Sequence, residues 1–282
     1  MPKFGAHMSI AGGVDRAFDQ AVETGCEAIQ IFNKSNNQWK ARELRAEEID
    51  RFHQRRQETG IEPVVSHASY LLNLGSPDEA LWEKSIAALR IELERCEILQ
   101  IPYLVLHPGA HMKQGPAAGM SRVAAALDRI HETLPDHQVK VTLELTAGQG
   151  TTLGRTFEEL AGIRDQCRRP ERLAICFDTC HALAAGYDFR TEAGYQEMMT
   201  RFDQVLGLDY LAVMHVNDSK KDVGSHVDRH THIGQGFIGL EPFAYFVNDD
   251  RLQNLPFLLE TPQEVKVETD KENLAKLRGL IS

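Results

Sequence analysis

Six side chains of the kinds that bind metal ions recur along this chain at nearly even intervals. Successive members are 34 to 45 residues apart, and most end a short apolar run such as YLVLH or LAICFD. They are His67, His107, Glu144, Asp178, His215 and Glu260. A β-strand with its return helix and two loops uses about this much chain, roughly 35 residues per unit of an eightfold barrel. The spacing therefore predicts an α/β fold, a (β/α)8 TIM barrel with a metal site at the C-terminal ends of the strands.

Eight apolar runs are expected to form the strands. They lie at residues 3–8, 28–32, 63–67, 103–107, 139–144, 173–178, 211–216 and 256–260. The intervening stretches 14–25 and 78–99 have helical periodicity, and the second opens after Ser-Pro-Asp, a favourable helix start. A doubly wound open sheet is the main alternative, but it explains less well why first, middle and last strands feed one site. No linker or composition break interrupts residues 1–282, which predicts a single domain.

The cysteines and the N-terminus bear on the cellular compartment. The five cysteines, an odd number without a CxxC motif, predict buried free thiols rather than a disulfide framework. The opening MPKFGAHMS has no apolar signal-peptide core. No apolar stretch approaches the roughly 20 residues of a membrane span. We therefore expect a cytoplasmic or nucleoid protein that does not enter a membrane.

The formal net charge of -10 argues against a generic nucleic-acid-binding protein, which is usually basic. Several of the carboxylates in that count lie in the predicted metal site, however. Bound divalent cations would make the mouth of the barrel locally electropositive. The predicted site therefore restores DNA as a possible ligand.

A long stretch without helical periodicity, residues 217–239, is expected to lie over the barrel mouth. Loops of this length in a compact domain are usually functional or disordered. Asp228 and His230 are two residues apart, so in an extended segment both lie on one face. His226 and His232 share that parity, but we favour Asp228 and His230 as the ligands.

His181 is a further candidate ligand, whereas the other histidines are not. Asp178 and His181 are three residues apart where a strand turns into a loop, so both can face the same cavity. His7 ends the first strand but lacks a partner motif, and we expect it to support a ligand rather than bind metal. His53, His131 and His137 fall in helical or helix-end sequence and are expected to face solvent. Nitrogen and carboxylate ligands without clustered thiolates suit zinc, manganese or iron.

Four sequence blocks resemble the motifs of the endonuclease IV family of apurinic/apyrimidinic endonucleases. They are SHASYLLNLGSP, HPGAH, FDTCHALAAGYD and HVNDSKKDVGSHVDRHTHIGQG, and the match runs from GAHMS to the LLETP of the last strand. The resemblance implies a barrel that binds three zinc ions, with manganese as a possible substitute. It implies a monomer that hydrolyses duplex DNA 5′ to an abasic site, leaving a 3′-hydroxyl and a 5′-deoxyribose phosphate, and that also trims blocked 3′ ends.

The resemblance also assigns the ligands. His67, His107 and Glu144 would hold the first zinc ion, and Glu144 would bridge to a second. The second ion would also be held by Asp178, His215 and Glu260, and the third by His181, Asp228 and His230. The catalytic roles would fall to Glu144, Asp178 and Glu260, which surround the bridged pair.

Two positions depart from the family pattern. Leu145 in LELTAG replaces an Asn, so a hydrogen bond that supports a ligand would be lost here, and Leu145→Asn would restore it. Asn37 replaces an Arg that wedges into the DNA stack, whereas Tyr70 matches the family's wedging Tyr. Lys220 is a phosphate contact or a solvated charge, and Tyr70 could instead pack on the helix that follows the third strand.

Two other functions fit the same pattern less well. A sugar isomerase or epimerase on this kind of barrel uses one or two metals and would leave Asp228 and His230 without a role. A DNA-damage-binding relative that has lost turnover is supported only by Leu145. Nicking of a duplex that contains one abasic analogue, compared with intact duplex and with free ketoses, separates the three.

Overall fold

Eight parallel strands close into a barrel, in a computed structural model that describes residues 1–262 and 266–282. The order around the barrel is β1-β10-β7-β6-β5-β4-β3-β2. The strands are β1 (Lys3–Met8), β2 (Ala28–Phe32), β3 (Val64–His67), β4 (Tyr103–Leu106), β5 (Lys140–Glu144), β6 (Leu173–Asp178), β7 (Leu211–His215) and β10 (Pro256–Leu259). Each predicted strand is present to within one residue at either end, and the closed order rules out the doubly wound sheet. The fold is a (β/α)8 TIM barrel, as predicted.

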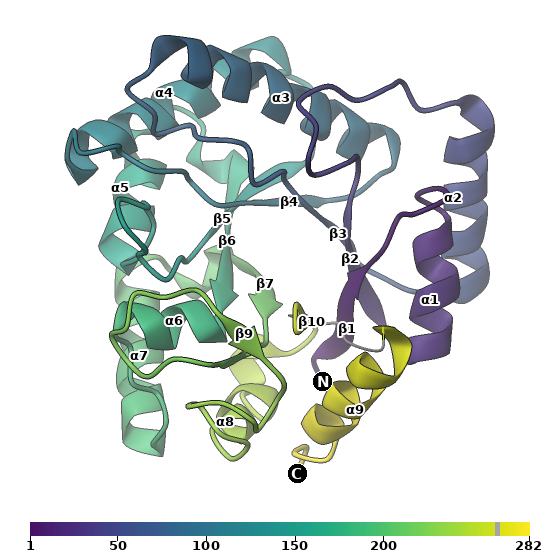
Figure 1. The fold of residues 1–282 in the computed structure, drawn as a ribbon, viewed down its shortest axis with the longest axis vertical. Coiled ribbons are helices and arrows are strands. Elements are labelled where there is room, and N and C mark those ends of the chain that lie inside the picture. Colours follow the sequence, from purple (N-terminus) through teal and green to yellow (C-terminus); the bar gives the residue numbers. More distant parts are fainter. Residues whose placement is uncertain (263–265) are drawn as a thin grey trace.

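Helices surround the barrel, as Figure 1 shows. They are α1 (Arg16–Thr24), α2 (Ala46–Thr59), α3 (Glu79–Ile98), α4 (Pro116–Thr133), α5 (Phe157–Gln166), α6 (Thr179–Ala185), α7 (Glu192–Val205), α8 (Phe243–Val247) and α9 (Lys266–Arg278). Short 3-10 helices lie at Pro170–Arg172, Leu208–Tyr210 and Asp250–Leu252. The expected start of α3 is present, because the Asp78 side chain accepts a hydrogen bond from the Leu81 amide at 2.8 Å.

The barrel interior and the layer between strands and helices have separate apolar cores. Val65, Val105, Cys176, Val213 and Leu258 belong to the small interior cluster. Alternate strand residues point outward and join the larger cluster that packs against the helices. Only glycine fits at position 5 of the interior, because a Cβ there would lie 1.7 Å from the Ala28 carbonyl oxygen. The next inward-facing position on every strand is at the C-terminal mouth.

The stretch predicted as a loop, 217–239, contains a small hairpin. β8 (Asp218–Ser219) pairs antiparallel with β9 (His230–Thr231). The buried Asp218 carboxylate accepts hydrogen bonds from the amides of Gly236 and Ile238, both at 2.9 Å. These bonds hold the hairpin and the turn after it, so this segment is fixed in place although it lacks the periodicity of a helix.

The prediction that His131 faces solvent is wrong, whereas His53 and His137 are partly exposed. His131 lies on the inner face of α4, and burial together with Arg172 and Arg169 lowers its pKa to about 4. The apolar residues Val123 and Leu127 lie eight and four positions before His131 on the same face of α4, so the helical spacing already indicated this burial.

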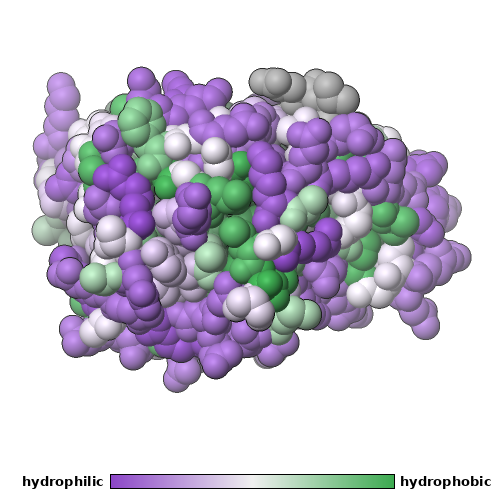
Figure 2. Space-filling view, turned by 90° about the horizontal axis from the view of Figure 1, so that it is seen from below, coloured by the Kyte–Doolittle hydropathy of each residue, from purple (hydrophilic) through white to green (hydrophobic). Residues whose placement is uncertain are grey.

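The cysteines are as predicted: all five are buried and unpaired. The face of the molecule drawn in Figure 2 is largely hydrophilic, with limited hydrophobic areas between the polar side chains. Within the described residues, no helix is both long and apolar enough to cross a membrane.

Candidate metal centre

Each of the eight strands places a polar side chain in one layer at the C-terminal mouth of the barrel. Each such residue lies two positions after an inward-facing residue of the strand, so its side chain points to the same side. The layer consists of His7, Gln30, His67, His107, Glu144, Asp178, His215 and Glu260. The strand register sets Asp178 beside His215. All six periodic residues found in the sequence are therefore brought together.

Glu144 lies at the centre of this layer and is fully buried. Its Oε2 atom lies 3.2 Å from His67 Nε2 and 3.0 Å from His107 Nε2. Its Oε1 atom lies 3.1 Å from His215 Nδ1 and 3.2 Å from His181 Nδ1. His181 Nδ1 also adjoins the Leu145 carbonyl oxygen, so the nitrogens that can bind a cation beside Glu144 are those of His67 and His107 at Oε2 and that of His215 at Oε1. The two carboxylate oxygens thus face different potential ligands, as a carboxylate bridge requires.

Two further groups of potential ligands adjoin Glu144. His215 Nδ1 lies 3.2 Å from Glu260 Oε2 and 3.8 Å from Asp178 Oδ2. His230 Nε2 lies 3.5 Å from both Asp178 Oδ2 and Asp228 Oδ1.

Among the described residues, the potential ligand atoms of histidine and carboxylate side chains form three groups, in each of which the atoms lie within 4.8 Å of one another, and two further groups include Cys176 or Cys180. The three groups are His67, His107 and Glu144; Glu144, Asp178, His215 and Glu260; and Asp178, His181 and His230. Asp228 joins the third through His181, since its Oδ2 lies 3.2 Å from His181 Nε2.

Oxygen atoms fix the orientation of four of the imidazoles. His67 Nδ1 lies 2.7 Å from the Ala68 carbonyl oxygen and His230 Nδ1 lies 3.1 Å from that of Glu260. His181 Nδ1 lies 2.9 Å from the Leu145 carbonyl oxygen. Because a carbonyl can only accept, each of these nitrogens carries the proton and the other nitrogen presents its lone pair to the cluster. Histidines that bind metals almost always donate their second nitrogen in this way.

Gln30 on β2 orients the fourth imidazole, and sequence reasoning missed it. Its Nε2 atom donates to Glu260 Oε1 at 2.6 Å, and its Oε1 atom lies 2.8 Å from His215 Nε2. A carboxylate only accepts, so the amide cannot be flipped, and the Gln30 oxygen must receive the proton of His215 Nε2. The signal that could have found Gln30 is a polar side chain inside the apolar run AIQIF.

Asn217 and Asp178 form a second supporting arrangement that the sequence did not reveal. The buried Asn217 side chain donates to Asp178 Oδ2 at 2.8 Å and accepts from the Glu260 amide at 2.7 Å. The other oxygen of Asp178, Oδ1, accepts from the His181 amide at 2.8 Å and caps the N-terminus of α6. One carboxylate therefore faces the cluster and starts the helix that carries the next ligand.

Opposite charges dominate the electrostatics of the cluster. Burial alone would raise the pKa of the Glu144 carboxyl, but His107 and His215 hold that pKa well below its usual value. Burial likewise opposes protonation of His181, yet Asp178 and Asp228 raise the pKa of that imidazole well above its usual value. Divalent cations bound to these groups would replace such protons, since metal binding requires neutral imidazole and ionised carboxylate.

The donor set fits transition-metal ions such as zinc. The layer offers imidazole nitrogens and carboxylate oxygens, which suit zinc, manganese and iron. The Nε2 atoms of His181 and His230 are buried and lie 3.2 to 3.5 Å from carboxylate oxygens, but in the described part of the chain neither atom makes a hydrogen bond of good geometry. Buried nitrogens of this kind are normally satisfied, so their orientation toward carboxylates is the arrangement of ligands rather than of a packed core.

Two cysteines lie next to the ligands without matching them chemically. Cys176 adjoins Glu144 and His215, and Cys180 adjoins Asp228 and His230. Burial raises the pKa of both thiols to about 12. Both thiols are fully buried, as expected of cysteines in core packing, and Cys176 belongs to the interior apolar cluster.

The other predicted histidines take the positions of supporting residues or lie apart. His7 Nδ1 lies 3.5 Å from Glu260 Oε1 and 3.0 Å from Gln30 Nε2, beside the ligands. His232 Nδ1 contacts the Asn273 amide on α9 at 3.2 Å. His226 is exposed, and its Nδ1 lies 3.2 Å from the Ala147 carbonyl oxygen. Among the described residues, neither His226 nor His232 belongs to a group of potential metal ligands.

Leu145 does not point toward the metal centre. Its side chain is fully buried in the core between the strands and the helices. Its carbonyl oxygen is the part that supports a ligand, through the 2.9 Å contact with His181 Nδ1. A side-chain amide at this position would therefore lie in the apolar layer, away from the ligands.

We expect Leu145→Asn to destabilise the protein by roughly 1–3 kcal/mol without raising activity, because it buries an amide in an apolar layer. This replaces the expectation from sequence that the amide restores a lost hydrogen bond. The measurement is the urea midpoint of unfolding together with the nicking rate per folded molecule. A higher nicking rate at unchanged stability would restore the original interpretation.

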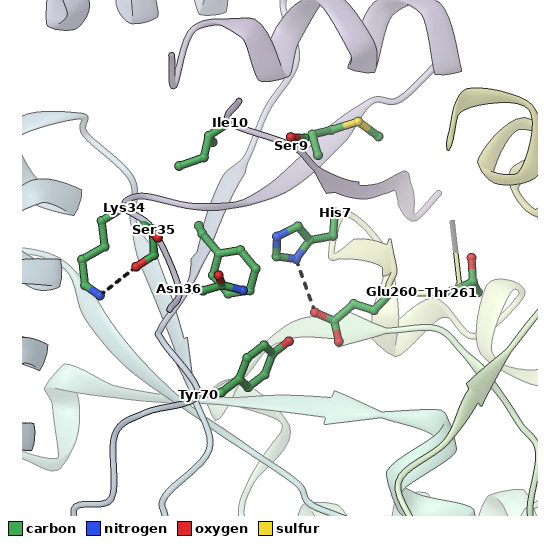
Figure 3. A pocket seen from close by; sticks show the side chains of 11 residues that line it. His7, Ser9, Ile10, Lys34, Ser35, Asn36, Tyr70, Glu260 and Thr261 are labelled. Atoms are coloured by element: carbon green, nitrogen blue, oxygen red, sulfur yellow. Dashed lines mark hydrogen bonds and ion pairs between the residues drawn. The ribbon is translucent and has the colours of Figure 1, made fainter. Parts of the chain in front are cut away.

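A cavity of about 500 Å³ adjoins the metal centre and is shown in Figure 3. His7 and Glu260 line it on one side, and Tyr70 and Asn36 line it from two loops. The Tyr70 ring is 60% exposed, with its centroid 5.3 Å from that of His67. Tyr70 thus stands at the rim rather than packing beneath α3.

The other two predicted DNA contacts are exposed. Asn37 lies in the loop after β2, next to the cavity-lining Asn36. Lys220 follows β8 in the hairpin, where its amide donates to the Arg229 carbonyl at 2.9 Å. A second cavity, of about 260 Å³, lies on the opposite side of the ligands, between His107, Gln149 and Asp228. The cleft therefore extends on both sides of the metal centre.

Comparison with known proteins places this architecture in a family. A family model described as xylose isomerase-like TIM barrel matches residues 18–279. A protein named Probable endonuclease 4 from Chloroflexus aurantiacus is 50% identical over 281 residues, which covers 100% of this chain and 99% of that protein. The crystal structure of endonuclease IV from Thermus thermophilus gives a TM-score of 0.88 at 38% identity, covering 99% of this chain and 98% of that one.

Sugar epimerases share the barrel but little of the sequence. A D-tagatose 3-epimerase-like protein gives a TM-score of 0.73 at 20% identity over 99% of this chain and 98% of its own, a likeness of fold alone. By contrast, the protein from Chloroflexus aurantiacus is 50% identical to this chain over its full length. This chain therefore belongs to the endonuclease IV family, within the xylose isomerase-like TIM barrels.

Proposed function

We propose that this chain is a zinc-dependent DNA repair endonuclease that cleaves duplex DNA 5′ to abasic sites. The products would be a 3′-hydroxyl and a 5′-deoxyribose phosphate, and the same site would trim blocked 3′ ends. We further propose that the protein acts as a monomer of one domain, residues 1–282, on DNA in the cytoplasm. The relatives named endonuclease 4 and endonuclease IV support the nuclease assignment.

The fixed imidazoles are the observation that carries this proposal. Four histidines donate one nitrogen to an oxygen acceptor and turn the other toward the carboxylates of the cluster. We assign three zinc ions to nine ligands, with manganese as a possible substitute. The ligands are His67, His107, Glu144, Asp178, His181, His215, Asp228, His230 and Glu260. Nine ligands are more than a single ion can use, which favours a multinuclear site.

Zinc ions at these ligands would supply Lewis acidity for the phosphodiester and a nucleophilic oxygen at neutral pH. The residues of the chain supply the geometry. Glu144 faces two groups of ligands at once, and Gln30 and Asn217 hold the carboxylates of Glu260 and Asp178 by hydrogen bonds of 2.6 and 2.8 Å. Such supporting contacts keep ligands in place as charge develops on the substrate.

The cavity beside the metal centre suits a nucleotide turned out of the duplex. Its volume of about 500 Å³ lies in the range of small-molecule sites. An abasic site costs less to extrude than a paired base, because it has little stacking to lose. We assign Tyr70, Asn37 and Lys220 to DNA binding. Tyr70 would lie next to the gap that the extruded nucleotide leaves in the base stack, and Lys220 would contact a phosphate. His7 would support Glu260 from the wall of the cavity.

The test is a nicking assay on a duplex with a single tetrahydrofuran abasic analogue, with the product ends identified by mass spectrometry. We expect cleavage 5′ to the analogue, no cleavage of the intact duplex and no change in free ketoses. Epimerisation of a ketose without nicking would overturn the proposal. Binding of the abasic duplex without turnover would instead support the damage-binding alternative.

Tyr70→Ala is expected to weaken binding to abasic duplex by roughly 1–3 kcal/mol, the size of a lost stacking contact. The reason is the exposed position of the ring at the rim of the cavity. The measurement is fluorescence anisotropy at fixed salt, with metal content determined in parallel.

The control is Val22→Ala, which removes an exposed apolar side chain on α1 that does not line this cavity. Its affinity should equal that of the unmodified protein. If Tyr70→Ala lowers thermal stability and leaves the DNA affinity unchanged, Tyr70 has a packing role instead.

A further inference from the structure

Two loops form the rim of the cavity beside the metal centre. The first rim loop, residues 33–39, follows β2, and the second rim loop, residues 68–72, follows β3. Asn36 of the first and Tyr70 of the second line the cavity from neighbouring positions, as Figure 3 shows. The shape of the cavity mouth therefore depends on how far apart these loops are held.

Glu92 on α3 contacts both rim loops through one buried carboxylate. Its Oε1 atom lies 3.2 Å from Lys34 Nζ of the first rim loop. Its Oε1 and Oε2 atoms accept from the Ser69 amide of the second rim loop at 3.3 and 3.2 Å. The side chains of Lys34 and Glu92 are only 3% and 1% exposed, so solvent does not screen this pair.

Additional hydrogen bonds tie the same groups together. Lys34 Nζ also donates to the Gln38 carbonyl at 2.7 Å, within its own loop. The Ser69 hydroxyl donates to the Asn36 carbonyl at 2.5 Å, from one rim loop to the other. The Asn33 side chain donates to the Glu92 carbonyl at 2.9 Å. Each rim loop is thus attached to α3, and the two are attached to each other.

The energetics favour a positioning role over a stabilising one. Burying two charges costs several kcal/mol per ion, and apolar replacements of buried pairs are often neutral or stabilising. Burial raises the pKa of the Glu92 carboxyl, and the Lys34 ammonium opposes that rise. An apolar core at this place would cost less free energy, but it could not hold the Ser69 amide and the Gln38 carbonyl at defined positions.

We propose that the buried Lys34–Glu92 pair sets the spacing of the two rim loops and thereby positions the residues that recognise the lesion. The pair is not part of the metal centre, since among the described residues neither member belongs to a group of potential metal ligands. This inference rests on the proposed function, and its role is in substrate binding rather than in the chemical step.

The test compares Glu92→Leu, Lys34→Met and the double variant in the full-length metal-loaded protein. Glu92→Leu should raise KM for the abasic duplex by roughly 10- to 100-fold, the scale of small misplacements at a site. Its hydrolysis of bis(4-nitrophenyl) phosphate, a small diester that does not need the rim loops, should stay within about twofold. Hydrogen exchange should show both rim loops losing protection together.

The double variant separates positioning from folding. Glu92→Leu alone leaves a buried ammonium unpaired and can lower stability, whereas the double variant removes both charges. We expect the double variant to regain the melting temperature and to keep the raised KM. Glu83→Gln is the matched control, because Glu83 is on the same helix but pairs with Arg129 at the exposed surface. Its KM should not change.

Three outcomes overturn the inference. One is an unchanged KM in the folded double variant, and another is a parallel loss of duplex and small-diester hydrolysis. The third is loss of protection in only one rim loop. A wild-type protein that hydrolyses the small diester and does not nick the abasic duplex refutes the proposed function and, with it, the assignment to lesion recognition. The wild type distinguishes the two failures: it nicks the abasic duplex when only the inference fails, and it does not nick the duplex when the proposed function fails.

Discussion

Glu144→Gln is expected to lower the rate of abasic-duplex nicking by about 10³-fold, more than the 10- to 100-fold typical of residues that only orient a ligand. The Glu144 oxygens lie within 3.0 to 3.2 Å of nitrogens from four histidines. Glutamine keeps the size of the side chain but removes the negative charge, and its amide nitrogen cannot bind a cation. One change therefore disturbs two groups of ligands.

The measurement for Glu144→Gln is single-turnover nicking together with the metal content of the purified variant. We expect fewer bound ions as well as slow nicking. Glu58→Gln is a suitable control, because Glu58 pairs with Arg55 on the exposed side of α2. Full metal content with near-normal nicking in Glu144→Gln would remove Glu144 from the centre of the proposed site.

Chelation is expected to abolish nicking, and readdition of zinc or manganese is expected to restore it. The purified protein should contain close to three ions per chain by elemental analysis, since nine residues are assigned as ligands. The circular dichroism spectrum should not change on chelation, because the large apolar core between the strands and the helices keeps the barrel folded. The melting temperature should fall, because ligands that bind only the folded state stabilise it.

Two results of the chelation experiment would contradict this prediction. Full activity with one ion per chain would refute the three-ion assignment. Activity that persists in chelator, with no ion detected, would refute the metal-dependent function altogether. A control with magnesium readdition should fail to restore nicking, since imidazole-rich sites disfavour this ion.

The strands and the ligand layer could be predicted because barrel geometry repeats. Each strand delivers an inward side chain at the same height, so residues such as His107 and His215 can be recognised by residue type and spacing. Gln30 occupies the equivalent position on β2 and was missed, because glutamine is not a typical ligand and an isolated polar residue in a strand has many explanations. The strand periodicity predicts at which level along the barrel axis a side chain lies, but it does not predict which group that side chain hydrogen-bonds.

Other features depend on contacts between distant segments and left no local signal. Asn217 joins Asp178 to Glu260 across strands that are far apart in the sequence. Leu145 differs from these features, because its outward orientation follows from strand alternation beside Glu144 and could be predicted from the sequence. Lys34 and Glu92 meet only because α3 packs behind both rim loops, and charge counting along the sequence cannot reveal a buried pair.

The Asp178 cap explains why two ligands are spaced as they are in FDTCH. The hydrogen bond from the His181 amide to Asp178 Oδ1 closes a small ring of chain, and this ring exists only when three residue steps separate the two. Inserting one residue between them would shift the helix start, turn His181 by about 100° around the helix axis and take it away from Asp228. Insertions and deletions should therefore be excluded from this tetrapeptide during evolution, whereas the exposed turn at Pro135 and Asp136, between α4 and β5, has no such restriction on its length.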